Sequence, residues 1–151
     1  TTVILPGPLD TITPSENKEL VTQILENDGL ILSEYPPGTP IEKKNFVERD
    51  RIQAGLSGGV FVGQSGIPGG TLHTVRYTLK YDRKLLVFDP SSEEKQYEGN
   101  NRLISEAPQN EDFSYLNVKT NKTVEVLQAK KVLADFIITN EESINDSLEK
   151  I

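Results

Sequence analysis

The sequence predicts an α/β fold in which helices pack on both faces of a mostly parallel sheet. Two short apolar runs, residues 60–62 and 85–88, are each bounded by turn residues, and a glycine-rich turn and a helical pattern lie between them. This order is typical of a βαβ unit. Earlier apolar runs repeat the strand, helix and strand order, so we expect right-handed parallel crossovers throughout.

Apolar runs and their stop signals predict the elements along the first ninety residues. The first strand ends at Pro6, and a helix opens at Pro14 with an apolar stripe that stops at Asn27. The next strand stops before Pro36, because proline donates no ladder hydrogen bond. The predicted strands are residues 3–5, 30–32, 60–63 and 85–88. The predicted helices are residues 14–26, 44–56 and 70–81.

Beyond Pro90 the pattern is weaker. We expect a polar loop at 91–99, a short helical turn at 100–104 and a short helix at 141–151. The apolar residues of 123–127 and 136–138 suit either strands or one stripe of a helix, so periodicity leaves both alternatives open.

Composition excludes several classes of protein. The 151 residues include no cysteine, so no disulfide or thiolate metal site is possible, and a single histidine, His73, makes no metal site by itself. No apolar run is long enough to span a membrane and no charged-then-apolar leader opens the chain, so we expect a cytoplasmic location without a membrane partner.

Basic residues are concentrated in one segment of an acidic chain. Residues 43–84 contain eight Lys or Arg and three Asp or Glu, a local charge of +5 within a net charge of −7. Such a segment can steer an anion to one place. The alternative is that these charged side chains only form the solvent-exposed faces of helices.

The turn at 64–71 is the most suggestive place for a ligand. In a parallel sheet, ligands bind beyond the carboxyl ends of the strands, where loops lead into helices. Gly66, Gly69 and Gly70 let backbone N–H groups approach an anion at the start of the next helix, although an ordinary connection also fits this turn. Arg49 and Arg51 supply guanidinium groups, the natural partners of phosphate. Neither paired carboxylates nor an activated nucleophile is recognisable, so we expect no enzymatic activity, no catalytic residue and no cofactor.

Five stretches, in this order and spacing, resemble the DprA/Smf DNA-processing proteins: VILPGPLDTITPSEN, LILSEYPPGTP, NFVERDRIQAGLS, GGTLHTVRYTLKYDRKLLVF and EGNNRLISEAP. The resemblance implies a Rossmann-like three-layer αβα fold. It also implies a protein that binds single-stranded DNA in a basic pocket, forms a homodimer and loads a RecA-type recombinase during natural transformation.

Phe46, Arg49 and Arg51 match the family pattern Phe-x-x-Arg-Asn-Arg, with Asp50 in place of the asparagine. The segment from Gly70 to Thr74 matches the pattern Ser-Gly-Ser/Thr-Leu-x-Thr, with Gly69 in place of the serine. Arginines and helix-terminal amides suit phosphates, and an aromatic ring suits bases. The predicted DNA contacts are Lys43, Lys44, Phe46, Arg49, Arg51, Gly69, Gly70, Thr71, Thr74 and Arg76.

The resemblance implies one Rossmann-type domain over residues 1–151 that lacks its amino-terminal part, with the family core at 1–108 and a carboxyl-terminal extension at 109–151. Two other functions stay open. The LOG-type nucleotide phosphoribohydrolases, which bind nucleotides, share a Pro-Gly-Gly-x-Gly-Thr-x-x-Glu motif, of which only the opening is present here, without the glutamate. The third possibility is a scaffold domain that binds a protein and no nucleic acid.

Overall fold

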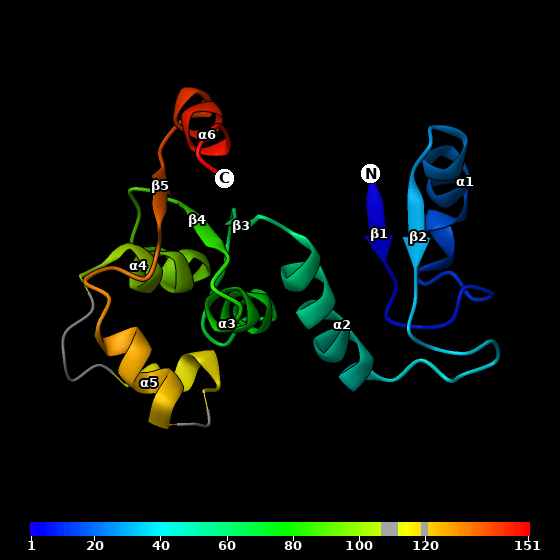
Figure 1. The fold of residues 1–151 in the computed structure, drawn as a ribbon, viewed down its shortest axis with the longest axis horizontal. Helices are drawn as coiled ribbons and strands as arrows, with labels where there is room; N and C mark the ends of the chain where they lie inside the picture. The colour runs from blue at the N-terminus through cyan, green and yellow to red at the C-terminus, as the bar shows by residue number, and fades with distance from the viewer. Residues whose placement is uncertain (107–111, 119–120) are drawn as a thin grey trace. The chain divides into compact units, whose positions relative to one another are not determined.

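The computed structural model describes residues 1–106, 112–118 and 121–151. Within it the chain divides into two compact units, residues 1–53 and 54–151, and each is described by itself (Figure 1). The division falls within helix α2 (Lys43–Leu56). The predicted boundary at residue 108 lies outside the described residues.

The first unit contains a βαβ arrangement, as predicted. Strand β1 (Thr2–Ile4) leads through the 3-10 turn η1 (Ser15–Asn17) to helix α1 (Lys18–Glu26), and β2 (Leu30–Leu32) returns parallel to β1. Gly29 makes the tight exit from α1 possible, because a Cβ atom there would lie 2.4 Å from Ile24 Cγ2.

The second unit is built on three parallel strands, and it confirms the predicted central βαβ unit. Strand β3 (Gly59–Val62), helix α3 (Thr71–Lys80) and strand β4 (Lys84–Phe88) follow one another, and β4 lies between β3 and β5 (Phe136–Ile138). The two alternatives that periodicity left open are also resolved, since residues 136–138 are a strand and 123–127 lie within helix α5 (Asn121–Gln128).

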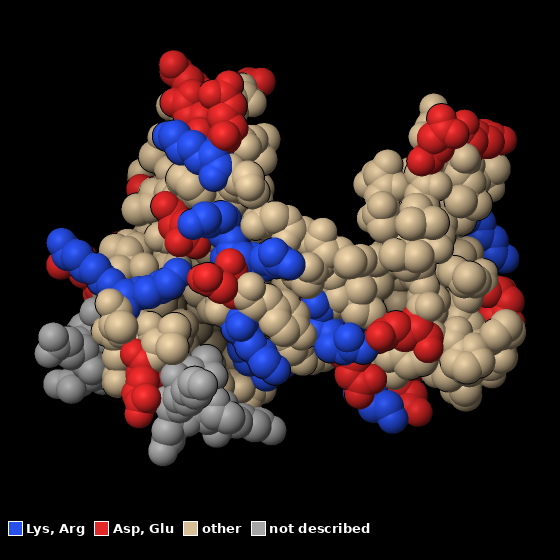
Figure 2. All heavy atoms as spheres, viewed as in Figure 1, with Lys and Arg blue, Asp and Glu red and all other residues tan. Residues whose placement is uncertain are grey.

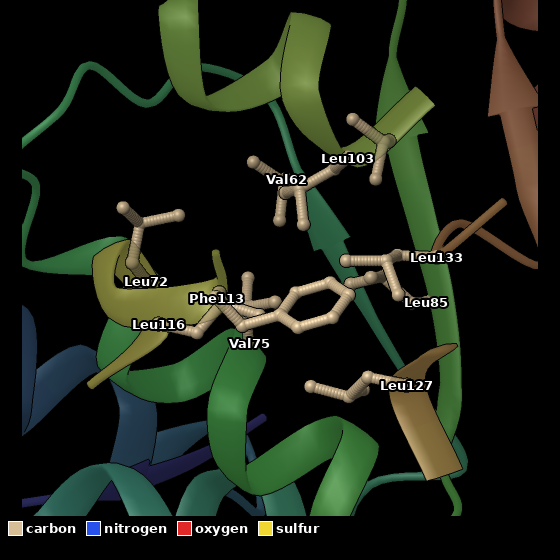
Figure 3. Close-up of a cluster of buried hydrophobic side chains, with 10 residues drawn as sticks. Val62, Leu72, Val75, Leu85, Leu103, Phe113, Leu116, Leu127 and Leu133 are labelled. Atoms are coloured by element: carbon tan, nitrogen blue, oxygen red, sulfur yellow. The ribbon is translucent and has the colours of Figure 1, made fainter. Parts of the chain in front are cut away.

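One face of this sheet carries the apolar core of the second unit. Val62, Leu85 and Val87 lie on that face, because Val62 pairs with Val87 and Leu85 is two residues before it. They belong to one buried cluster with Leu72 and Val75 of α3, whose i, i+3 spacing places them on one side of the helix. Figure 3 shows Val62, Leu72, Val75 and Leu85 within this cluster. The rest of the buried cluster comes from α4, η3, α5 and the segment before β5: Leu103, Phe113, Leu116, Leu127 and Leu133. This packing positions both ends of α3.

The remaining elements agree with the predictions in part. The expected helical turn at 100–104 lies within α4 (Glu98–Ile104), but the polar loop expected at 91–99 is interrupted by the 3-10 turn η2 (Lys95–Tyr97) and by the start of α4. The 3-10 turn η3 (Phe113–Leu116) was not predicted, and it precedes α5. Helix α6 (Glu141–Leu148) begins at a capping box between Asn140 and Ser143. Among the helices of the described ranges, none combines the length and apolar character that crossing a bilayer requires.

The predicted α/β class with parallel strands is confirmed. The described strands form two sheets, β1–β2 and β3–β4–β5.

Candidate nucleic-acid interface

Half of the predicted DNA contacts lie in the first nine residues of α2, in the first unit. Lys43 and Lys44 are exposed, and Lys44 Nζ lies 2.9 Å from Glu42 Oε2. That hydrogen bond raises the pKa of Lys44. Phe46 is 41% exposed, so part of its ring is open to solvent and available for stacking.

Arg49 points inward from α2. Its Nη1 donates a 2.7 Å hydrogen bond to the carbonyl oxygen of Ile4 in β1, and its Nε lies 3.4 Å from Asp50 Oδ1. The side chain is only 19% exposed. These contacts make Arg49 an anchor between α2 and β1.

Arg51 is more accessible, and it forms an ion pair with Glu34 in the loop after β2. Beside this pair, the Tyr35 hydroxyl donates a 3.1 Å hydrogen bond to Glu48 Oε2 of α2. The pKa of Tyr35 is raised by burial and by this bond to a carboxylate. The side chain of Arg51 remains 43% exposed, so a phosphate can approach the guanidinium and compete with Glu34.

A small cavity of about 230 Å³ adjoins these residues in the first unit. Phe46 and Arg49 form part of its wall, and β1 and α1 contribute mainly apolar side chains, including Ile4, Leu20 and Ile24. The structure therefore brings Phe46 and Arg49 together around one cavity.

The other predicted contacts lie in the second unit, at the start of α3 and along it. No hydrogen bond within the described residues uses the N–H groups of Gly70 and Thr71, and the first turn of α3 contains no acidic residue. Free amides at the positive end of a helix dipole attract an anion. Thr71 and Thr74 are half-buried in this turn.

Two adjacent glycines in the turn have different structural requirements. A Cβ atom at Gly69 would lie 2.6 Å from the Gly66 carbonyl oxygen and 2.8 Å from Ser65 Oγ, so the turn itself requires glycine there. At Gly70 a Cβ atom would meet nothing within 4 Å. The fold therefore tolerates a side chain at Gly70.

Asn100 is a buried polar residue that the sequence analysis did not identify. Its Oδ1 accepts a 2.7 Å hydrogen bond from the Ser65 amide, and its Nδ2 donates to the carbonyl oxygens of Gly63 and Phe88. It thereby joins the carboxyl ends of β3 and β4 below the glycine turn. The sequence offered one signal for its burial. Asn100 lies three residues before Leu103, and this spacing places both residues on the same, buried face of α4.

A polar hollow of about 610 Å³ opens beyond the end of β4, between the 89–95 loop and α4. Both acidic and basic side chains line it, among them Asp89, Glu93 and Lys95. The described parts of the chain contain no group of three His, Cys, Asp or Glu side chains suited to a metal ion.

The predicted site residues are thus divided between the units. Lys43, Lys44, Phe46, Arg49 and Arg51 belong to the first, and Gly69, Gly70, Thr71, Thr74 and Arg76 belong to the second. Within each unit the predicted residues lie along one element or one turn.

Comparison with known proteins shows what the chain is similar to. It is 38% identical over 104 residues to Protein Smf of Synechocystis, covering 69% of this chain and 26% of that protein. It is 37% identical over 98 residues to DNA processing protein DprA of Streptococcus pneumoniae, covering 65% of this chain and 34% of that protein. The chain thus spans about a quarter to a third of the length of these curated relatives.

A solved structure has the same fold. DNA processing protein A from Helicobacter pylori, studied for its single-stranded DNA binding mode, matches with a TM-score of 0.67 and 27% identity, covering 99% of this chain and 56% of that one. The family model for DNA recombination-mediator protein A matches residues 1–112. Since that match covers most of the chain, the protein belongs to the family of DNA recombination-mediator protein A, also called DprA or Smf.

Proposed function

We propose that this protein binds single-stranded DNA and acts as a recombination mediator that loads a RecA-type recombinase onto it. The observation that carries the proposal is the likeness, over 99% of the chain, to the Helicobacter pylori protein whose single-stranded DNA binding mode was described. Homodimer formation and a cytoplasmic location are parts of the same proposal.

Phosphates and bases would be held by different groups. Arg51 and the α3 amides suit phosphate oxygens, because a guanidinium and free N–H groups both donate hydrogen bonds to anions. Phe46, with an exposed ring, suits a base. Arg49 would contribute chiefly by holding α2 in place, since its Nη1 is already bonded to Ile4.

A titration with labelled single-stranded and duplex oligonucleotides at two salt concentrations tests the proposal. We expect tighter binding of single strands. Arg51→Gln should lower the salt slope by about 0.7, the value for one phosphate contact on a single strand. In the double variant with Arg49→Ala, the salt slope should fall by at most about 1.4, the value for two phosphate contacts.

Arg102→Gln is a matched control, because Arg102 is 44% exposed and also paired with an acid, Glu98, at 3.8 Å. It should leave the slope unchanged. Equal weakening by both variants would show that only net charge matters, and no binding of any strand would refute DNA binding and leave the scaffold reading.

We also propose that the protein has no hydrolase activity. Within the described structure, the Glu34 carboxylate is paired with Arg51, and the sequence identifies no other acid that could protonate a leaving group. Release of base from nucleoside monophosphates that disappears on Glu34→Gln would instead favour the LOG-type phosphoribohydrolase reading.

A further inference from the structure

Helix α3 carries two tyrosines that form a stack on its surface. Tyr77 and Tyr81 are four residues apart, which places them on one side of the helix. Their ring centroids are 5.9 Å apart, with an interplanar angle of 27°. Tyr81 forms the outer end of the stack and is 37% exposed, so part of its ring faces solvent.

Two cations lie against these rings. Arg76 Cζ lies 4.7 Å from the centroid of the Tyr77 ring, and Lys80 Nζ lies 5.8 Å from that of Tyr81. We call these four residues, Arg76, Tyr77, Lys80 and Tyr81, the α3 strip. Cations at aromatic faces keep long side chains near the rings and hold positive charge there.

Within the described part of the chain, the positive charge of the α3 strip has no acidic partner. Of the residues that the structure describes, no carboxylate lies within ion-pair distance of Arg76 or Lys80, whereas Arg49 and Arg51 each have an acidic partner. Asp82 is the only acid between residues 71 and 84. Lys and Arg side chains face the viewer over the region of α3, while Asp and Glu gather over α6 (Figure 2).

Tyr81 packs against the backbone at the end of α2. Arg83 Nη2 donates a 2.9 Å hydrogen bond to the carbonyl oxygen of Gly55, near the end of α2. Tyr81 Cε2 lies 3.7 Å from where a Cβ atom of Gly55 would be, so the ring rests against that backbone. Arg83 therefore connects the α3–β4 turn to the surface that supports Tyr81.

From this arrangement we propose that the α3 strip is a stacking site for single-stranded nucleic acid, separate from the α3 amino terminus. Tyr81 stacks on one base, Tyr77 supports Tyr81 from behind, and Lys80 binds an adjacent phosphate. Arg76 Nη1 also donates a 3.2 Å hydrogen bond to the carbonyl oxygen of Asn117, which leaves its charge without a described acidic partner. Aromatic rings for stacking and cations for phosphates are together the features that single-strand binding uses. The inference rests on the proposed function, which it deepens by naming a second contact.

The test uses the whole chain and two oligonucleotides of equal length, one of thymidines and one abasic. Tyr81→Ala should weaken binding of the thymidine strand about tenfold, as expected for loss of one stacked base. The same variant should bind the abasic strand as wild type does, because there is no base to stack. Tyr81→Phe should keep wild-type affinity for both.

Lys80→Gln should lower the salt slope by about 0.7 on both strands. Lys150→Gln, at an exposed lysine two residues after the end of α6, is the matched control and should change neither slope nor affinity.

Each other outcome overturns the assignment. If Tyr81→Ala lost equal affinity for both strands, Tyr81 would contribute only to the fold. If its affinity for the thymidine strand were unchanged, there would be no stacking site at Tyr81, although binding by the wild type would still support the proposed function. A wild-type chain that binds neither strand would refute both. If Tyr81→Ala instead lost polyglutamate binding and kept DNA binding, the α3 strip would be a surface for acidic proteins.

Discussion

Arg49 illustrates how a residue suited to phosphate can be committed to the fold. Its hydrogen bond to Ile4 joins the helix that carries the basic residues to the first strand. We predict that Arg49→Ala lowers the free energy of unfolding by about 1.5–3 kcal/mol, the usual range for a hydrogen bond to a charged group. Urea unfolding of the variant measures this, and Arg51→Ala, whose exposed pair is screened by solvent, should cost less than about 1 kcal/mol. The reverse order would show that Arg51 is the anchor.

Tyr35 makes stability depend on pH in the alkaline range. Its pKa is raised in the folded protein by burial and by its bond to Glu48. The folded state therefore retains this proton more strongly, so the stabilisation is complete below the unfolded pKa and is lost as pH rises through the folded pKa. We expect Tyr35→Phe to remove part of the decline in stability above pH about 10. Tyr97→Phe, at a residue without a described hydroxyl hydrogen bond, is the control, and an equal effect there would contradict the assignment.

Asn100 connects two strand ends with three hydrogen bonds. Asn100→Ala would leave the Ser65 amide and two carbonyl groups without this partner in a buried place, so we expect a loss of about 2 kcal/mol or more. The neighbouring variant Asn101→Ala removes a single bond, to the Ser92 carbonyl oxygen, and should cost about 1 kcal/mol. Thermal unfolding compares the two, and equal costs would refute a special role for Asn100.

At the scale of elements, the turn between β3 and α3 separates structural from binding requirements. Gly69→Ala forces a Cβ atom against the Gly66 carbonyl and should destabilise the fold by about 1–3 kcal/mol. Gly70→Ala meets open space with φ at −59°, so stability should change by less than about 1 kcal/mol.

Gly70→Ala, which should keep its stability, is the glycine variant that tests DNA binding. The methyl group of Gly70→Ala lies beside the α3 amides and should weaken single-stranded DNA binding at full stability. Unchanged affinity of this variant in the oligonucleotide titration would show that phosphate does not bind at the α3 amino terminus.

At the scale of the whole molecule, the apolar core lies in the second unit. The ten residues of the main buried cluster all belong to residues 54–151, whereas the buried residues of the described first unit are Asn45 and the short segment 4–8. We predict that a fragment of residues 43–151, which keeps α2 whole, unfolds cooperatively, and that residues 1–42 alone do not fold. Circular dichroism during thermal unfolding tests both fragments. A fragment 43–151 without a cooperative transition would contradict this reading.

Local patterns in the sequence were enough to predict the class of fold and most elements. Short apolar runs bounded by proline and glycine identified four strands, and the helical stripes between them required parallel crossovers, because side-chain periodicity reports the local backbone conformation directly. The glycine turn and the basic segment also stood out, since both are contiguous in the chain.

Contacts between distant residues were decided only by the tertiary structure. It assigned the strands to two sheets, made 123–127 helical and 136–138 a strand, and gave Arg49 and Arg51 their partners. It also buried Asn100 between two strand ends and left the Tyr81 ring partly exposed. The physical reason is that local patterns set the conformation of each segment, whereas the partner of a charged or polar group depends on which distant segments the folded chain brings within hydrogen-bond reach.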